Sequence, residues 1–363
     1  MSRRGENIRK RKDGRWEGRY IEKYDTNGKA CYRSVYSLSY TDLKNKLKEY
    51  KSGKSKKINY NISIENLCNE WLLSKELIVK QSTYTHYYTL INKHIIPYFK
   101  NKNVKCLINE SFDLFVADKG ICLSGKTVHD IIAVLKQIIR YAQTKQYIEY
   151  FDFNVNQPKI KNNDLPVLNN YEYSKLISYI QLTLENNKIG ILLSLFMGIR
   201  LGEICALKWE DVNFKTGTLR INKTMQRIKN LDINSENKTK IVIDKPKSQK
   251  SIRNIPIPSF ILNLLKEYQS DENNYLLSGT RNYIEPRAYQ KMFKRYLKQA
   301  GIENINFHAL RHTFATRAIE KDFDVKSLSE ILGHSSVKFT LEKYVHPSYE
   351  HKKMNMEKLS AFY

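Results

Sequence analysis

The stretch HALRHT (residues 308–313) places a histidine three residues before an arginine, in a helical pattern that continues through Ala318. Residues three apart are neighbours on one helical face, so the imidazole of His308 and the guanidinium of Arg311 should converge on one point. A zinc site at His308 and His312 is an alternative. However, the stretch lacks the glutamate of the H-E-x-x-H pattern, and no further carboxylate ligand is evident.

A second cluster, GIRLGEI (residues 198–204), overlaps the end of a very apolar helical segment, Ile189 to Ile199. A glycine-flanked turn presents Arg200, and Glu203 follows three residues later. An arginine that abuts such an apolar segment is partly desolvated and needs an anionic partner. That partner is either a substrate or Glu203 itself, in a purely structural ion pair. Taken alone, this cluster favours the ion pair.

A third cluster, PKS (residues 246–248) followed by SIRNIP (residues 251–256), predicts a hairpin turn that leads into a strand. A lysine at a mobile hairpin tip can swing toward a reaction centre, although most such lysines are merely solvated. Lys247 is the candidate, and Lys250 lies close enough to be the alternative.

The fourth cluster joins LGHSS (residues 332–336) to TLEKYVH (residues 340–346) and contains His334 and Tyr344. One tyrosine among 25 would mean nothing by itself. The information lies in the order of the four clusters along the chain, which runs arginine, lysine, His-x-x-Arg, histidine and then tyrosine.

This order, with these flanking residues, resembles the catalytic domain of the tyrosine recombinases, or phage integrase family, and the resemblance covers the whole chain. It implies a multidomain fold, with a small β-sheet plus a helix in an N-terminal domain, an all-α core-binding domain, and a mainly α catalytic domain with a small antiparallel sheet. Matched residue by residue, the resemblance implies one supporting residue, Glu203, and six catalytic residues: Arg200, Lys247, His308, Arg311, His334 and Tyr344.

The activity implied by the resemblance is site-specific recombination that integrates and excises a mobile genetic element. Tyr344 would attack a DNA phosphodiester, leaving a 3′-phosphotyrosine and a free 5′-hydroxyl. Two arginines would hold the non-bridging oxygens, and His334 would donate to one of them. His308 is the candidate base or hydrogen-bond relay, and Lys247 the candidate acid. Because the ester bond is conserved, neither ATP nor a metal cofactor is expected.

The partners implied by the resemblance are double-stranded DNA attachment sites of core and arm type, together with three more copies of the chain in a tetrameric synapse. A small excisionase and a host DNA-bending protein would be compatible further partners. A cytoplasmic, nucleoid-associated location is expected. The tail after Tyr344 would pack on a neighbouring protomer or locally, through its apolar residues Met354, Leu359 and Phe362.

The composition independently favours a polyanionic partner. The 363 residues include 62 Lys and Arg against 37 Asp and Glu, a net charge of +25, yet 41% are hydrophobic and 12% aromatic. This describes a folded basic protein rather than a disordered one. Five scattered cysteines without a CxxC pair predict neither a disulfide framework nor a cysteine zinc site. A charged beginning, Met1 to Lys12, and no apolar run of about 20 residues argue against secretion and membrane insertion.

Residues 1–57 hold 18 Lys and Arg against 7 Asp and Glu, so this segment should touch phosphate. Aromatic and β-branched runs around Asp13-Gly14 and Asn27-Gly28 predict three short antiparallel strands, followed by a helix from Thr41 to Tyr50 and a linker over 51–57. A basic disordered tail is the alternative. The candidate DNA-binding residues here are Arg9, Lys10, Arg11, Lys12, Arg15 and Arg19.

Helical periodicity dominates residues 58–155, which predicts a core-binding domain of about four helices, and residues 156–165 form a polar, basic linker. Residues 166–363 are predicted to form the catalytic domain and its tail. There, 219–221 and 241–243 are expected to pair as strands, with another strand at 252–257. Further DNA-binding candidates are Lys80, Ser82, Thr83, Tyr84, Lys126, Lys159 and Lys161.

Three other functions remain open from the sequence. A chromosome-dimer resolvase would use the same chemistry, although the basic N-terminal segment argues against it. A DNA-binding regulator with an inactive catalytic domain would need an incomplete residue set, which is not what the four clusters show. A metallohydrolase would lose its activity in EDTA.

Overall fold

The computed structural model describes residues 7–11, 13–24, 29–51, 61–109, 112–160, 166–232, 234–246, 249–303, 305–344, 353 and 356–357. The chain divides into two compact units. The first comprises Met1–Lys80 and His86–Ile160, and the second comprises Gln81–Thr85 and Lys161–Tyr363. Several predicted positions lie outside the described residues: the Asn27-Gly28 turn, Lys12, Lys161, Lys247 and the tail residues Met354, Leu359 and Phe362.

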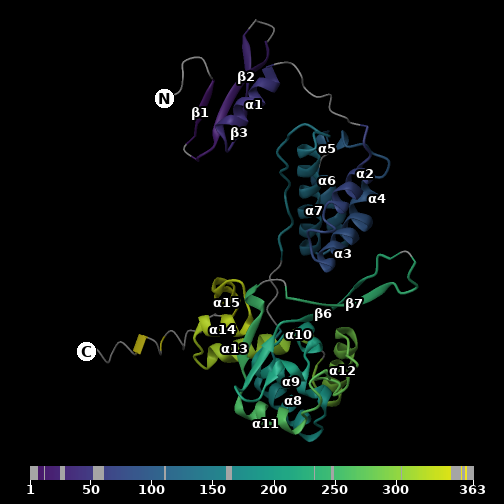
Figure 1. Cartoon of the computed structure of the whole chain (residues 1–363), viewed down its shortest axis with the longest axis vertical. Coiled ribbons are helices and arrows are strands. Elements are labelled where there is room, and N and C mark those ends of the chain that lie inside the picture. Colours follow the sequence, from purple (N-terminus) through teal and green to yellow (C-terminus); the bar gives the residue numbers. More distant parts are fainter. Residues whose placement is uncertain are drawn as a thin grey trace. The chain divides into compact units, whose positions relative to one another are not determined.

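The first unit begins with a three-stranded antiparallel sheet in which β2 lies between β1 and β3, and one helix covers the sheet (Figure 1). Ile8 from the sheet and Leu43 and Leu47 from the helix form its small core. The prediction of three strands and a helix is confirmed. The elements are β1 (Ile8–Lys10), β2 (Trp16–Tyr24), β3 (Ala30–Ser37) and α1 (Tyr40–Lys51).

The rest of the first unit is helical, as the periodicity predicted. The longest helix, α7, buries one apolar stripe, and its first turn is capped by the Ser124 hydroxyl, which accepts from the backbone N–H of Thr127. The elements are α2 (Ile64–Leu73), α3 (Gln81–Leu90), η1 (Ile91–Ile95), α4 (Ile96–Tyr98), α5 (Cys106–Asn109), α6 (Phe112–Cys122) and α7 (Gly125–Thr144). The start of α3, Gln81–Thr85, is assigned to the second unit.

The segment from α3 to α4 is continuous, and its middle part, η1, is a π-helix. Pro97 follows directly in α4. A proline ring has no N–H to donate and collides with the carbonyl four residues earlier, which here is that of Lys93. The wider π turn gives this carbonyl room, and the helix ends one residue after Pro97, at Tyr98.

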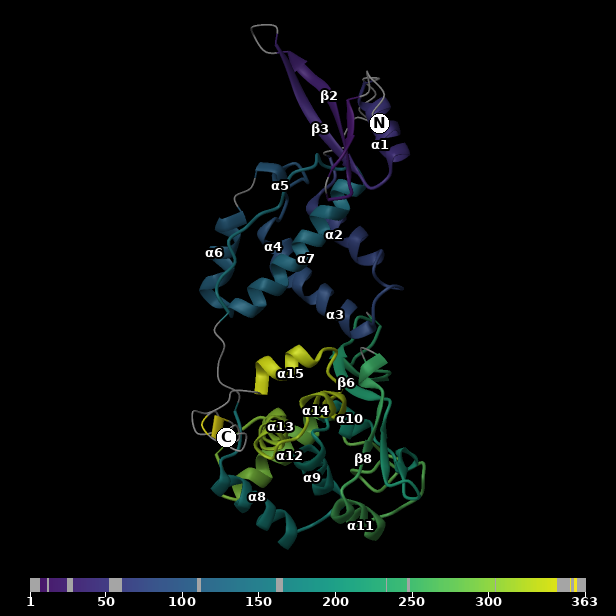
Figure 2. The same ribbon diagram turned by 90° about the vertical axis from the view of Figure 1, so that its left-hand side faces the viewer.

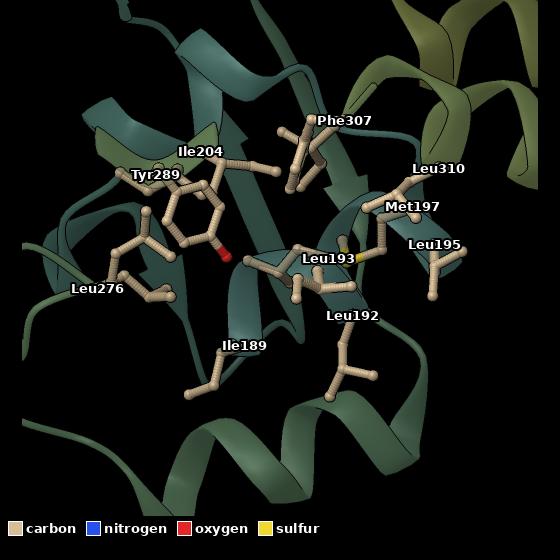
Figure 3. Close-up of a cluster of buried hydrophobic side chains, with 14 of the residues drawn as sticks. Ile189, Leu192, Leu193, Leu195, Met197, Ile204, Leu276, Tyr289, Phe307 and Leu310 are labelled. Atoms are coloured by element: carbon tan, nitrogen blue, oxygen red, sulfur yellow. The ribbon is translucent and has the colours of Figure 1, made fainter. Parts of the chain in front are cut away.

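The second unit is mainly helical and packs around α9, the most apolar helix (Figure 3). Ile189, Leu193 and Met197 of α9 contact a core that also contains Tyr289 and Phe307 from later in the chain. The helices are α8 (Asn170–Leu182), α9 (Asn186–Met197), α10 (Leu201–Ala206), η2 (Trp209–Asp211), η3 (Gln249–Ser251), α11 (Ser259–Glu267), α12 (Pro286–Gln299), α13 (His308–Glu320), α14 (Val325–Leu332) and α15 (Val337–Tyr344).

The turn after α9 depends on a glycine. Gly198 ends the helix in the left-handed conformation, with φ of 63°. A Cβ atom there would lie 2.6 Å from the Phe314 ring of α13, so a larger residue fits neither the backbone nor the packing. This turn directs Arg200 out of the core and toward the segments that follow α14.

The strands of the second unit correct one prediction. Residues 219–221 and 241–243 do lie in strands, but in two separate sheets, so they do not pair. The intervening strand β6, whose sequence TMQRIK reads as polar, pairs with β7 in a hairpin visible in Figure 1. The strands are β4 (Val212–Asn213), β5 (Thr218–Ile221), β6 (Thr224–Lys229), β7 (Thr239–Asp244) and β8 (Arg253–Pro256).

Within the second unit, α13, α14 and α15 lie together on one side (Figure 2), with Phe314, Leu328, Leu332 and Tyr344 in a shared apolar cluster. The predicted multidomain architecture, with a small sheet, an all-helical region and a mainly helical catalytic region, is confirmed. In the part of the chain that the structure describes, every helix is too short or too polar to cross a lipid bilayer.

Candidate active site

Arg200 lies directly before α10 and is held by Glu203 in two ways. The backbone N–H of Arg200 donates to Glu203 Oε2 at 3.1 Å, and its Nη1 donates to Oε1 at 2.8 Å. The carboxylate therefore caps the helix and fixes the guanidinium together. Arg200 Nη2 also donates to the carbonyl of Gly333 at 3.2 Å, which ties α10 to the end of α14.

Arg253 on β8 binds the same carboxylate, a role that the sequence did not suggest. Its Nη2 donates to Glu203 Oε2 at 2.9 Å, and its Nε donates to the carbonyl of Ile331 at 2.6 Å. Its side chain is only 7% exposed. Strand alternation puts Arg253 on the same face as the buried Ile255. A charged residue at such an inward-facing position is the feature of the sequence that could have indicated a buried ion pair.

Glu203 is thus the centre of a group of arginines. Burial alone would raise the pKa of this carboxyl group, but Arg253, Arg200 and Arg311 outweigh that effect and hold the pKa below its usual value. Three guanidinium groups around one carboxylate leave a net charge of +2. Because uncompensated charge is costly in a protein interior, this group is suited to bind a further anion.

Arg311 on α13 is the most deeply buried of the three, with 1% of the residue exposed. Its Nη1 donates to the carbonyl of Gly198 at 2.6 Å, and its Nη2 donates to the carbonyl of Leu332 at 2.7 Å. Burial, followed by the nearby charge of Arg200, lowers the pKa of Arg311 to about 9. The side chain therefore joins the ends of α9 and α14 in one fixed position.

His334 lies beside Arg311, and its hydrogen bonds define which ring nitrogen carries the proton. Arg311 Nη2 lies 2.9 Å from His334 Nε2, and His334 Nδ1 lies 2.8 Å from Thr340 Oγ1. Because arginine can only donate, Nε2 must accept, and Nδ1–H donates to Thr340. In this state His334 does not offer Nε2–H to a phosphate, in contrast to the predicted donor role.

Tyr344 ends α15 and is buried, with its ring near those of His312 and His334. Its Oη lies 2.9 Å from His312 Nδ1, and its ring is stacked parallel to that of His334 with centroids 6.2 Å apart. Burial raises the pKa of the Tyr344 hydroxyl, while Arg311 and Arg200 act in the opposite direction. His312 was considered only as a zinc ligand from the sequence, and its contact with Tyr344 depends on how α13 and α15 pack.

His308 begins α13, is exposed, and places its ring 4.6 Å from that of His312 in an edge-on arrangement. Partial loss of water, followed by the charge of Arg311, lowers the pKa of His308 to about 4. For His312 and His334, burial is the largest cause of the shift, and it lowers the pKa of each to about 3. All three imidazoles are therefore neutral at pH 7.

The structure places Arg200, Glu203, Arg311, His334 and Tyr344 close together. Arg200 is hydrogen-bonded to Glu203 and Arg311 to His334, while the charges of both arginines act on Tyr344. His308 lies at the edge of this group, against His312. Lys247 lies outside the described residues. The alternative, Lys250, donates from Nζ to the carbonyl of Ser335 at 3.0 Å, next to His334. The predicted hairpin turn is wrong, because β7 and β8 belong to different sheets and the segment between them connects the two.

Comparisons with known proteins concern the family and the fold of this chain. Residues 166–351 match the phage integrase family, and residues 63–107 match its N-terminal SAM-like domain. The first match alone covers more than half of the chain. The chain belongs to the phage integrase family. The predicted tyrosine recombinase fold and site-specific recombinase activity of the integrase type are thereby confirmed.

Two relatives match the integrase-family chain over most of its length. It is 26% identical to a tyrosine recombinase XerC-like protein of Caldanaerobacter subterraneus subsp. tengcongensis, over 89% of this chain and 90% of the relative. It is 24% identical to the ICEBs1 integrase of Bacillus subtilis, over 84% of this chain and 83% of the relative. The likeness therefore extends well beyond the region that carries the candidate site.

Solved structures show the same fold. The Tn1549 transposon integrase in complex with a circular intermediate DNA has a TM-score of 0.67 and 20% identity, over 82% of this chain and all of that one. A lambda integrase dimer bound to a COC′ core site has a TM-score of 0.57 and 16% identity, over 95% of this chain and 96% of that one. At these identities the likeness concerns the fold.

The N-terminal sheet of this integrase-family protein carries most of the first group of DNA-binding candidates on exposed positions. Arg9 and Arg19 both bond to Glu17, at 2.8 and 3.2 Å. Hydrogen bonding from Arg9 is the largest effect that lowers the pKa of Glu17. Lys10 lies over the Trp16 ring, whereas Arg11 and Arg15 lie over the Tyr36 ring.

The second group of DNA-binding candidates is divided between two helices and a following segment. Lys80 precedes α3, and Ser82, Thr83 and Tyr84 lie half-buried in its first turns. Lys126 is exposed at the start of α7, and Lys159 is exposed in the segment where the Pro158 carbonyl bonds to His129 of α7 at 2.8 Å. Among the described residues, no group of three or more His, Cys, Asp or Glu side chains could hold a metal ion.

Proposed function

We propose that this recombinase cuts and rejoins DNA through attack of the Tyr344 hydroxyl on a phosphodiester, with a 3′-phosphotyrosyl intermediate and a free 5′-hydroxyl. The convergence of Arg200, Arg311 and Tyr344 from three separate helices carries the proposal. The charge of Arg311 acts both on the Tyr344 hydroxyl, whose pKa it lowers, and on Glu203. A nucleophile and a positively charged anion site are therefore adjacent.

The two arginines suit the transition state of this reaction. A phosphodiester gains negative charge on its equatorial oxygens as the tyrosine attacks, so positively charged donors fixed beforehand bind that state preferentially. Arg200 is the accessible one, with a third of its side chain exposed, and its described side-chain bonds reach only Glu203 and Gly333. Arg311 supplies the buried second fork.

Proton transfer completes the proposed reaction. The Tyr344 hydroxyl must lose its proton during attack, with His308 as candidate base or relay, and the leaving 5′-oxygen must gain one, with Lys247 as candidate acid. Lys250 is the alternative acid, since it lies beside His334. In the free protein His334 orients Arg311. It would donate to phosphate from Nε2 only after the Arg311 bond is broken and Nε2 gains a proton.

The reaction is proposed to need neither a metal ion nor ATP. The phosphotyrosyl ester keeps the energy of the cleaved bond, and attack by the 5′-hydroxyl of the partner strand regenerates the tyrosine. The arginines supply the positive charge that a metal would supply elsewhere. Cleavage is therefore expected to continue in EDTA and without nucleotide.

The natural substrate is proposed to be double-stranded DNA at core and arm attachment sites of a mobile genetic element, recombined in a homotetrameric synapse. A lambda integrase tetramer bound to a Holliday junction, with a TM-score of 0.55, supports the fold-level comparison. The basic N-terminal sheet is proposed to bind the arm sites, with an excisionase and a host DNA-bending protein as further partners. The site of action would be the cytoplasmic nucleoid.

The test is covalent trapping on a nicked attachment-site duplex, from which the short cleaved product diffuses away. Wild-type protein should accumulate a protein–DNA adduct at Tyr344, in EDTA as well as in magnesium. Tyr344→Phe should form none while binding the duplex with nearly normal affinity, because only the hydroxyl is lost. An adduct that persists in this variant, or that maps to another residue, would contradict the proposal.

A further inference from the structure

We propose that His312 takes the proton from the Tyr344 hydroxyl as the tyrosine attacks phosphorus. This inference rests on the proposed function, in which Tyr344 is the nucleophile. It assigns the first acceptor role to a residue next to Arg311 in α13, rather than to His308, which the His-x-x-Arg pattern favoured.

The contact between the two residues is short and buried. His312 Nδ1 lies 2.9 Å from Tyr344 Oη, and 4% of His312 and 6% of Tyr344 are exposed. Water therefore has little access to the phenolic proton, and a side chain must remove it. The distance is within the range required of a general base and the group that it deprotonates.

The direction of this hydrogen bond depends on the His312 tautomer. Because the pKa of His312 is about 3, the imidazole is neutral at pH 7 and carries one proton. In the tautomer protonated at Nε2, Nδ1 accepts the proton of the Tyr344 hydroxyl. The nearby positive charge of Arg311 favours the phenolate that forms during attack.

The other two imidazoles are less suited to this role. His334 stacks on the Tyr344 ring, but its Nε2 accepts from Arg311 and its Nδ1 donates to Thr340. His308 is exposed and contacts the ring of His312. Among the described residues, His312 is thus the one imidazole whose hydrogen bond reaches the tyrosine oxygen.

The surroundings of His312 couple its basicity to the substrate. The titratable and charged groups that face it are His308 and Arg311 of its own helix and Lys343 and Tyr344 of α15. The positive charges among them oppose protonation in the free protein. A bound phosphodiester offsets this charge, so the imidazole becomes a stronger base only when the substrate is in place.

The step is balanced in both directions. The Tyr344 proton moves to His312 Nδ1 while the Oη–P bond forms and the P–O5′ bond breaks, and the 5′-oxygen gains a proton from the acid. Rejoining reverses these transfers, with the imidazolium returning its proton to the departing tyrosine oxygen. The imidazolium formed during cleavage lies close to the phosphorylated tyrosine, where opposite charges stabilise each other.

The test compares His312→Asn with wild type in single-turnover adduct formation between pH 6 and pH 10. The asparagine amide places a polar group near the position of Nδ1 but cannot accept the proton. Adduct formation should slow by about 10²-fold or more at pH 7 and then rise by about tenfold per pH unit, as hydroxide takes over. Wild type should be nearly independent of pH from about 7 to 9.

Two further measurements separate a base from a structural residue or an acid. Free imidazole should restore cleavage to His312→Ala by filling the vacated space. On DNA whose bridging 5′-oxygen is replaced by sulfur, a leaving group that needs no acid, the His312→Asn defect should persist, whereas that of the true acid variant, Lys247→Ala or Lys250→Ala, should disappear. DNA affinity and thermal unfolding of each variant show whether it has folded.

Three results would overturn the inference: a wild-type rate and pH profile in His312→Asn, rescue of that variant by the sulfur substrate, or no rescue of folded His312→Ala by imidazole. If His312→Asn does not fold, the wild-type profile on the sulfur substrate decides, since it should fall at low pH as the base becomes protonated. Failure of the proposed function is separate, because it would show as an adduct in Tyr344→Phe.

Discussion

Two regions of this integrase are built on the same plan, with one covered glutamate among several arginines. In the N-terminal sheet, the Glu17 side chain is 3% exposed and pairs with Arg9 and Arg19, which are 64% and 51% exposed. In the catalytic unit, the Glu203 side chain is also 3% exposed, but Arg253 and Arg311 are almost fully buried. The two carboxylates are equally buried, whereas the arginines around them differ in exposure.

The difference indicates two uses of positive charge. Exposed arginines stay hydrated and can change rotamer, so they can adapt to a DNA backbone. Their contribution to DNA affinity decreases as the salt concentration rises. Buried arginines held by carbonyls of Gly198, Leu332 and Ile331 cannot move, so they stabilise charge at one fixed point. The first region should therefore govern binding, and the second should govern rate.

The largest expected effect is that of Arg311→Lys. A lysine has a single nitrogen and cannot donate to the carbonyls of Gly198 and Leu332, to His334 and to a phosphate at the same time. We expect adduct formation to fall by about 10³-fold, with DNA affinity changed little. Single-turnover trapping at saturating protein measures the rate, and a gel-shift titration measures the affinity.

The matched control is Arg317→Lys, on the same helix. Arg317 bonds to Asn170 and stacks on Tyr173, away from the candidate site. Its substitution should leave the rate within about threefold of wild type. Similar losses in the two variants would mean that α13 tolerates no change, and the comparison between buried and exposed arginines would lose its basis.

The second effect concerns stability and its dependence on pH. The pKa of Glu203 is held below its usual value in the folded protein. At a pH between the folded and the ordinary pKa, the unfolded chain therefore binds more protons than the folded one. The stabilisation from this carboxylate is complete above the ordinary carboxyl pKa and is lost as the pH falls through the folded value. Glu203→Gln should cost about 3 kcal/mol at pH 7, by leaving buried arginines unpaired.

Glu17→Gln is the matched variant for this measurement. The pKa of Glu17 is also lowered, chiefly by its bond from Arg9, so the sign of the pH dependence is the same. Its arginines remain hydrated when the carboxylate is lost, so the cost should be less than about 1 kcal/mol. Chemical unfolding at pH 7 and pH 4 should show the deficit of Glu203→Gln shrinking in acid. Equal costs for the two variants would contradict the distinction.

Much of the fold followed from periodicity. The apolar pattern of α9, the three N-terminal strands and the helical run through α7 were predictable because side-chain spacing reports which face is buried. Pairing was not predictable in the same way. Residues 219–221 (LRI) and 241–243 (IVI) both contain aliphatic residues typical of strands, but such short runs do not identify their pairing partners. The polar residues of β6 gave no comparable strand signal.

The candidate site shows the same division. Arg200, His308, Arg311, His334 and Tyr344 stood out because their order along the chain resembles that of the family. The roles of Arg253, His312 and Thr340 arise from tertiary contacts between β8, α13, α14 and α15. Only Arg253 left a trace in the sequence, as a charge at the inward position before Ile255.

The smallest expected effect is that of Arg9→Gln, on the proposed arm-binding sheet. An exposed arginine that contacts one phosphate should contribute a few-fold in arm-site affinity and about 0.9 to the slope of log affinity against log salt. Cleavage of an isolated core site should stay within about twofold of wild type, because Arg9 plays no part in that reaction. Titrations at several salt concentrations measure the slope.

Lys46→Gln removes the same charge from the same domain and serves as the control. Lys46 is exposed on α1 and pairs with Asp42, four residues earlier. If position on the sheet matters, Arg9→Gln should reduce the salt slope and Lys46→Gln should not. Equal reductions would show that this domain attracts DNA through its overall charge, and the exposed arginines of the Glu17 group would then have no more specific role than any surface lysine.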